Sequence, residues 1–184
     1  MTPPGSFAVI GNGAGVAEAI ARLLVTAHGW TEVGEGPVDA VLIDTVDDEE
    51  AIEFDRLTDA DLARLYVEPT VRLEQAAHQA VLRLKEPGAL LFVGTDAYLG
   101  RPSGAAQSAA SGSMVLLARS LPLWKPSIRS NVLVLPSARV RRDEPTIADA
   151  AGMAAVLLTA ASVNGETISI AGGAHLQPPP RPVL

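Results

Sequence analysis

Short apolar runs alternate along this chain with longer segments in which apolar residues recur at helical spacing. Apolar runs of roughly four to eight residues bounded by turn-forming residues are typical of strands, and a period of about 3.6 residues over a longer stretch is typical of helices. Strands are predicted at residues 7–10, 38–43, 89–93, 128–135 and 166–170, with a short one inside 28–33. Helices are predicted at residues 16–26, 62–84, 105–121 and 147–161.

Prolines and polar residues set the predicted limits of these helices. Thr58, followed by acidic residues, is predicted to cap the second helix. Pro69 is predicted to kink that helix or divide it in two, and Pro87 with Gly88 to stop it. Pro122 is predicted to end the third helix.

Most of the predicted strands are apolar along their whole length, which is typical of strands buried on both faces in a parallel sheet. Alternation with helices then predicts an α/β fold: a Rossmann-like, doubly wound parallel sheet of about five or six strands, formed as one domain over residues 1–184. Residues 175–184 are proline-rich and are predicted to form an extended tail. Ligands of such a sheet bind beyond the carboxyl ends of its strands, here residues 11–17, 44–47, 94–98 and 136–140.

Charge and composition exclude several functions. The 184 residues include 14 Lys and Arg against 21 Asp and Glu, and the net charge of -7 makes nucleic acid and anionic membranes poor partners. No apolar stretch approaches the length of a membrane span. Cysteine does not occur, which excludes thiol chemistry and disulfides and suits a cytoplasmic location. His28, His78 and His175 stand far apart without carboxylates at ligand spacing, so no metal site is expected.

A glycine-rich turn joins the first predicted strand to the first helix. Glycines there let the backbone approach a diphosphate, and the N-terminus of the helix offers unpaired N–H groups. The spacing departs from G-x-G-x-x-G and fits only a looser G-x-x-x-G-x-A. A tight strand-to-helix turn also needs glycine for structural reasons, so both interpretations stay open. If a cofactor binds, the candidate residues are Gly11, Asn12, Gly13, Gly15 and Val16.

The order of these segments resembles the short-chain dehydrogenase/reductase family over nearly the whole chain. The matching segments are 10–21 with the opening glycine turn, 39–43 with the strand before Asn-Asn-Ala-Gly, 88–93 with the strand before the catalytic serine, 128–136 with Ile-Arg-Val-Asn-x-Val-x-Pro, and 164–173 with the closing Thr-Gly-x-x-Ile-x-x-Asp-Gly-Gly. The resemblance implies the fold of that family, an NAD(P) cofactor and a helix-borne Tyr-x-x-x-Lys pair that exchanges a proton with the substrate.

The residues at the catalytic positions depart from this pattern. Gln107 stands where the tyrosine is expected and Ser111 where the lysine is expected, one helical turn further on. An amide does not exchange protons usefully near neutral pH, and a serine hydroxyl carries no positive charge. The catalytic serine falls on Gly94 or, with a shift of one residue, on Thr95, of which only Thr95 can donate a hydrogen bond. The Asn-Asn-Ala-Gly segment is replaced by residues 43–46, and the resemblance therefore implies a catalytically degenerate member.

The chain is also shorter than the family pattern. Only 13 residues separate Leu24 from Val38, whereas a further strand, helix and strand need about 20 or more at ordinary lengths. The third strand and its helices, which wall the adenine pocket in the family, are therefore expected to be missing beside the second strand. The short connection from Pro136 to the helix near Ile147 implies that the substrate lid is missing too.

Other polar residues are weaker candidates for a site. Tyr98 offers a displaced acid, although polar residues are ordinary in strand-end loops. Glu32 or Glu35 either binds a ribose hydroxyl or forms solvated surface. Residues 139–142 are a small basic run, either a contact for an anion or partner, or an exposed loop. The further polar residues near the predicted crevice are Asp96, Ser108 and Ser113.

Two functions follow from these observations. The first is a non-catalytic structural or regulatory subunit without a cofactor, which associates with a second copy or with a catalytic dehydrogenase of the same family. In the family the two central helices pair between subunits as a four-helix bundle, and their equivalents here, 62–84 and 105–121, are rich in Ala and Leu. The second is an NAD(P)-dependent oxidoreductase that acts on a carbonyl or alcohol with relocated acid/base groups. Its direct support is the glycine turn at Gly11 and Gly15.

Overall fold

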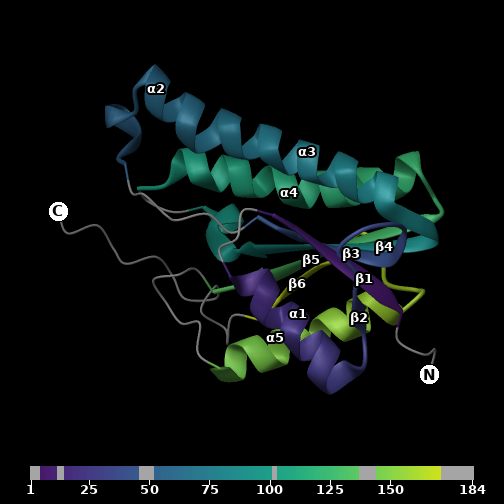
Figure 1. Cartoon of the computed structure of the whole chain (residues 1–184). Coiled ribbons are helices and arrows are strands. Elements are labelled where there is room, and N and C mark those ends of the chain that lie inside the picture. The colour runs from purple at the N-terminus through teal and green to yellow at the C-terminus, as the bar shows by residue number, and fades with distance from the viewer. Residues whose placement is uncertain (1–4, 12–14, 46–51, 101–102, 137–143, 171–184) are drawn as a thin grey trace.

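The computed structural model describes residues 5–11, 15–45, 52–100, 103–136 and 144–170. Within them, parallel strands form one six-stranded sheet in the order β2-β1-β3-β4-β5-β6 (Figure 1). The strands are β1 Ser6–Gly11, β2 Thr31–Glu32, β3 Val38–Asp44, β4 Leu84–Thr95, β5 Ile128–Leu135 and β6 Thr167–Ser169. The helices are α1 Val16–His28, α2 Asp59–Leu62, α3 Glu68–Arg83, α4 Ala105–Trp124 and α5 Glu144–Thr159, with a π-helical turn Ala63–Val67 and 3-10 turns Phe54–Arg56 and Asp96–Leu99. The predicted doubly wound α/β fold is confirmed.

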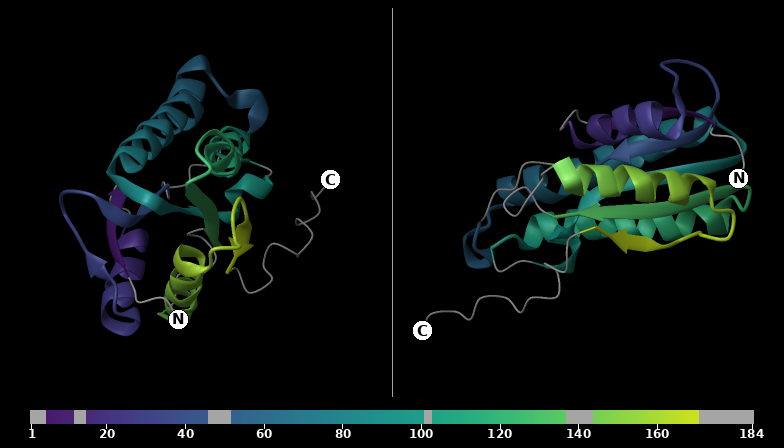
Figure 2. Two further views of the ribbon diagram at one scale, coloured as in Figure 1. Left: turned by 90° about the vertical axis from the view of Figure 1, so that its right-hand side faces the viewer. Right: turned by 90° about the horizontal axis from the view of Figure 1, so that it is seen from below.

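Helices cover both faces of the sheet. α1 and α5 lie on one face, and α3 and α4 lie on the other (Figures 1 and 2). Successive residues of each strand point to opposite faces, so that Leu42 belongs to the apolar cluster under α1 and α5, whereas Ile43 belongs to the cluster under α3 and α4. Burial of each large apolar side chain stabilises the fold by about 1.5–3 kcal/mol. No helix in the described part of the chain is both long and apolar enough to cross a membrane.

The strand order reverses between β1 and β3. From β1 the chain runs outwards to β2, returns to β3 on the other side of β1, and then continues to β6. Gly11 and Asp44 are the last paired residues of β1 and β3. In a doubly wound sheet, the crevice beyond the carboxyl ends of the strands at such a reversal is the usual ligand site.

The edge beside β1 is short, as predicted. β2 consists of two residues, Thr31 and Glu32, which pair with Ser6 and Phe7. The chain then enters β3 directly, so the 13 residues between Leu24 and Val38 hold only the end of α1, β2 and a loop. The described sheet therefore ends where a longer member of this fold class would add another strand.

The roles predicted for two prolines at helix ends are wrong. α4 continues past Pro122 to Trp124. The proline removes only one helical hydrogen bond, and the next turn is still bonded, because the amide of Lys125 donates to the carbonyl of Leu121 at 2.8 Å. α3 ends at Arg83, within one residue of the predicted end at Leu84, but Pro87 and Gly88 lie in β4 and do not stop the helix; Leu84 is already extended and pairs with Val38 in the sheet.

The start of the second helical region agrees with its sequence. The amide of Asp61 donates to the Thr58 hydroxyl at 3.2 Å, and the amide of Thr58 donates to the Asp61 carboxylate at 3.1 Å. The helix that begins there widens into the π-helical turn, and Pro69 lies in the first turn of α3. Pro69 thus marks a division of the helix, one of the two predicted alternatives, and local π geometry is a common device at such points.

Candidate functional site

A cavity of about 510 Å³ opens at the carboxyl ends of β1, β3 and β4. α3 and the π-helical turn line one side of it, and the first turns of α4 line the other. The cavity therefore lies at the strand reversal, on the face covered by α3 and α4. Its charged lining residues are Asp44, Arg64, Glu68 and Arg72, and its amide and hydroxyl residues are Thr45, Gln75, Gln79, Thr95, Gln107 and Ser111.

Three of the four positions that the sequence resemblance assigns to catalytic residues line this cavity together. Thr95 ends β4, whereas Gln107 and Ser111 stand one turn apart on α4 and therefore share a face of that helix. Thr95 is 8% exposed, and its hydroxyl accepts a hydrogen bond from the amide of Ala97 at 3.4 Å, which caps the following 3-10 turn. The structure thus brings Thr95, Gln107 and Ser111 to one site.

Gly94, the fourth position, is blocked by its neighbours. A Cβ at Gly94 would lie 2.6 Å from the sulfur of Met114 and 3.0 Å from the hydroxyl oxygen of Thr45. That hydroxyl donates to the carbonyl of Val93 at 2.9 Å, which holds Thr45 in place. The space that a serine would need at Gly94 is filled, so Thr95 is the residue of this pair that faces the cavity.

The acidic groups of the described lining are the carboxylates of Asp44 and Glu68. Among the described residues that line the cavity there is no Tyr, Lys, His or Cys. Amides and aliphatic hydroxyls bind ligands through neutral hydrogen bonds and do not ionise near neutral pH. Of the charged residues, Arg64 pairs with Asp61 at 3.2 Å. The site is equipped to hold a polar molecule.

The remaining polar candidates do not add an acid or base to this site. Tyr98 packs against the apolar cluster under α3 and α4 and does not line the cavity. The Ser113 hydroxyl donates to the carbonyl of Ala110 in its own helix. The Ser108 hydroxyl is buried and has no hydrogen-bond partner among the described residues. Residues 139–142 lie outside the described part of the chain.

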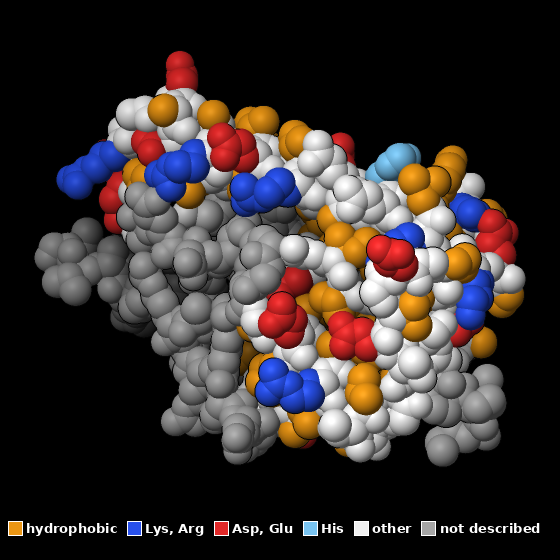
Figure 3. Space-filling view, in the orientation of Figure 1, with side chains coloured by type: hydrophobic (Ala, Val, Ile, Leu, Met, Phe, Trp, Pro, Cys, Tyr) orange, Lys and Arg blue, Asp and Glu red, His pale blue; other side chains and the backbone are white. Residues whose placement is uncertain are grey.

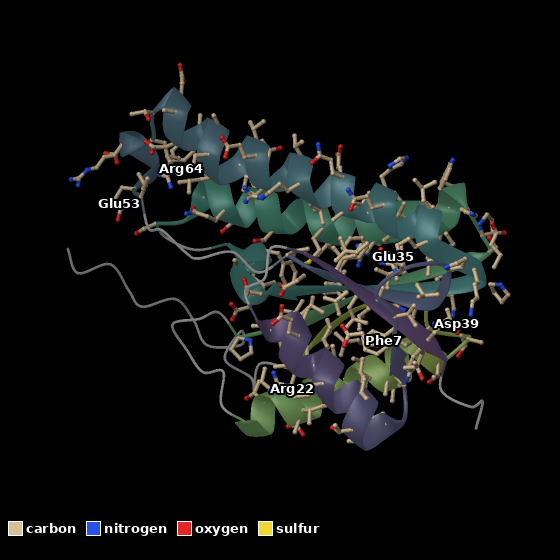
Figure 4. The ribbon with its side chains drawn as sticks, viewed as in Figure 1. Phe7, Arg22, Glu35, Asp39, Glu53 and Arg64 are labelled. Atoms are coloured by element: carbon tan, nitrogen blue, oxygen red, sulfur yellow. The ribbon has the colours of Figure 1, made fainter. Side chains whose placement is uncertain are left out.

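The acidic candidates for a ribose contact lie elsewhere. Glu32 is exposed and pairs in the sheet with Phe7, which lies four residues before Gly11 and therefore away from the carboxyl end of β1. Glu35 follows in the loop before β3 and lies far from Arg64 at the cavity (Figure 4). Both glutamates belong to the solvated surface, which is the second of the two interpretations of these residues. No cluster of metal-ligating side chains occurs in the described ranges.

The N-terminus of α1 is capped by a residue from β3. Gly15, with φ of 78°, precedes the helix and has no side chain to cap it. The carboxylate of Asp44 accepts a hydrogen bond from the amide of Ala17 at 3.3 Å, and Asp44 is only 7% exposed. A Cβ on Gly11 would lie 2.5 Å from the Cβ of Asp44, so packing already requires glycine there, and Gly11 also lines the cavity. Asn12 and Gly13 lie outside the described residues, and Gly15 and Val16 do not line the cavity.

Solved structures of similar shape place this architecture among known folds. A short-chain dehydrogenase/reductase (glucose/ribitol dehydrogenase) from Brucella melitensis matches with a TM-score of 0.70 and 20% identity, over 91% of this chain and 95% of that one. A Serratia marcescens short-chain dehydrogenase/reductase, solved as a double mutant, matches with 0.69 and 18%, over 94% and 99%. A small-chain dehydrogenase matches with 0.77 and 15%, over 95% and 100%.

This chain has the short-chain dehydrogenase/reductase fold. No protein-family model and no curated protein sequence matches it. The likeness to the solved dehydrogenases, at TM-scores of 0.70 and 0.77 but identities of only 20% and 15%, shows the fold alone. The function of the cavity within that fold therefore depends on the residues that line it.

Within the short-chain dehydrogenase/reductase fold, one wall of the cavity was not anticipated from the sequence. Glu68, Arg72, Gln75 and Gln79 of α3 all line it. Their spacing of four, three and four residues places them on one face of a helix, so the signal was present in the sequence as a polar stripe beside the apolar one. Polar stripes on helices usually face solvent, and only the packing of α3 beside α4 turns this one towards the cavity.

Proposed function

We propose that this chain is a non-catalytic member of the short-chain dehydrogenase/reductase family that serves as a structural or regulatory subunit. The observation that carries the proposal is the position of Gln107 and Ser111 in the cavity beside Thr95. By resemblance, those two positions belong to the tyrosine that exchanges a proton and to the lysine that lowers the pKa of the tyrosine. An amide and a hydroxyl supply neither the proton nor the charge.

The proposed partner surface is the outward face of α3 and α4. Large apolar side chains are exposed there, among them Val71 at 45%, Leu116 at 66% and Leu123 at 86%. Hydrophobic side chains follow the upper edge of the molecule over α2 and α3 (Figure 3). Exposed apolar side chains gathered on adjacent helices favour association with another helix pair, and a second copy or a catalytic subunit of the same fold supplies one.

The oligomeric state tests this proposal. Size-exclusion chromatography with light scattering is expected to give a dimer or larger assembly of the chain alone, or a complex when it is co-expressed with a catalytic dehydrogenase of this fold. Leu116→Asp is expected to dissociate the assembly. Val156→Asp is the matched control, because Val156 is 51% exposed on α5, on the other face of the sheet. A strict monomer that captures no dehydrogenase would contradict the subunit role.

The second candidate is an NAD(P)-dependent oxidoreductase with relocated groups. The observation in its favour is Thr95, which keeps a hydroxyl in the cavity at the end of β4. Incubation with NADH or NADPH and a panel of carbonyl and alcohol substrates tests it. Steady nicotinamide-dependent turnover that Gln107→Ala or Ser111→Ala abolishes would overturn the non-catalytic proposal, and absence of turnover supports it.

A further inference from the structure

The N-terminus of α1 lies at the strand reversal, where the doubly wound fold binds the phosphates of a dinucleotide. Backbone N–H groups and the positive end of the helix dipole make such a terminus attractive to an anion. In this chain an anion is already there. The carboxylate of Asp44, at the end of β3, accepts a hydrogen bond from the amide of Ala17 in the first turn.

The position of Asp44 is fixed by the sheet. It pairs with Gly11 in register, and a Cβ on Gly11 would lie 2.8 Å from the Asp44 carbonyl oxygen, so the two strand ends are in close contact. Asp44 is the last residue of β3 and lines the cavity, and its carboxylate reaches the amide of Ala17 at the start of α1. Asp44 is 7% exposed, so little solvent screens its charge.

A diphosphate at this terminus would meet the carboxylate of Asp44 at short range. Like charges in a poorly solvated site repel, and the Ala17 amide, one of the first-turn donors open to a phosphate oxygen, is already bonded to Asp44. The residues present therefore do not fit the diphosphate of a nicotinamide dinucleotide.

We propose that Asp44 is an internal substitute for the cofactor diphosphate, which caps α1 and prevents nicotinamide dinucleotides from binding at the strand reversal. This is separate from the loss of acid/base residues, because a non-catalytic protein can still bind a dinucleotide as an effector. Saturable binding of NADH without turnover would overturn this inference and leave the non-catalytic proposal intact.

The test is isothermal titration with NADH, NADPH and inorganic pyrophosphate, on the wild-type chain and on Asp44→Asn. Asparagine keeps the size of the Asp44 side chain and removes its charge. Position 44 lies within the segment 43–46 that replaces the Asn-Asn-Ala-Gly of the family. The wild type is expected to show no saturation up to about 1 mM, and Asp44→Asn to gain saturable binding at least about tenfold tighter. Asp39→Asn is the matched control, since it removes one negative charge from the same strand.

Each remaining outcome decides the proposal. Micromolar binding of NADH to the wild type would overturn it. Failure of both chains to bind, or equal gains in Asp44→Asn and Asp39→Asn, would overturn the specific role of Asp44. If Asp44→Asn does not fold, the wild-type titrations decide: absence of saturation with NADH, NADPH and pyrophosphate supports the proposal, and saturable binding of any of them overturns it.

Discussion

The guanidinium of Arg129, on β5, donates a hydrogen bond to the carbonyl of Leu157 near the end of α5, with 2.9 Å between Nη1 and the oxygen. It also donates to the carbonyls of Leu158 at 2.8 Å and Ala160 at 3.0 Å. The last carbonyls of a helix have no partner within it, and a cation there is favoured by the helix dipole. Burial lowers the pKa of Arg129. One side chain thus joins the end of α5 to the sheet.

Arg129→Ala is therefore expected to lower the free energy of unfolding by about 2–4 kcal/mol, since hydrogen bonds to a charged group contribute about 1.5–3 kcal/mol and three acceptors lose their donor. Urea denaturation followed by circular dichroism measures the change. The matched control is Arg119→Ala, expected to lower it by less than about 1 kcal/mol, because Arg119 makes one exposed bond of 3.4 Å to the carbonyl of Gly165. Equal losses in the two variants would contradict the assigned role.

Asn131 holds the loop before β6 against β5. Its side-chain amide donates to the carbonyl of Val163 at 3.0 Å, and its oxygen accepts from the amide of Glu166 at 3.0 Å, in a position only 1% exposed. Asn131→Asp is expected to lower the free energy of unfolding by about 2–4 kcal/mol, because a carboxylate cannot donate to Val163 and is buried in its place. Denaturant unfolding checks this value, and a loss below about 0.5 kcal/mol would show that the pair of bonds is dispensable.

The roles of Arg129 and Asn131 explain why the fold was predictable. Both belong to the segment 128–136, which matches Ile-Arg-Val-Asn-x-Val-x-Pro of the dehydrogenase pattern, and both bind backbone groups of distant segments. These two residues hold the end of α5 and the loop before β6 against β5, so their pattern in the sequence depends on the fold. The apolar strands were predictable for a related reason, since burial on both faces leaves a continuous apolar run.

The parts that escaped prediction depend on contacts between segments. α3 ends before Leu84 because Leu84 pairs with Val38 in the sheet, and no residue near Leu84 in the sequence predicts that pairing. Asp44 meets α1 only because β1 and β3 are adjacent and in register. The sequence marks both strand ends as possible ligand sites, but their contact comes from the topology of the sheet.

A serine at Gly94 would require the end of the buried Met114 side chain to move. Gly94→Ser is expected to lower the free energy of unfolding by about 1–3 kcal/mol, because the new Cβ overlaps the side chain of Met114. Thr95→Ser, which removes one methyl group beside it, is expected to lower it by less than about 1.5 kcal/mol. A double-mutant cycle with Met114→Ala measures the coupling: the double variant is expected to be more stable than additivity allows, and strict additivity would exclude the overlap.

The carboxylate of Asp39, at the start of β3, contributes to the stability of the chain in a way that depends on pH. Burial raises its pKa, but hydrogen bonds from the amide and hydroxyl of Ser6, each 2.7 Å, and the ammonium of Lys85 at 3.0 Å outweigh burial, so the pKa of Asp39 is lowered. A carboxyl whose pKa is lower in the folded state stabilises the protein above its unfolded pKa of about 3.9, and this contribution disappears as the pH falls through the folded value. As the pH falls below about 4, the free energy of unfolding of Asp39→Asn is expected to decrease less than that of the wild type. The difference is expected to be under about 1 kcal/mol, because the Asp39 side chain is 41% exposed. Urea midpoints measured between neutral pH and about pH 2 test this, and parallel curves for the two chains would show that the folded and unfolded pKa values of Asp39 are the same.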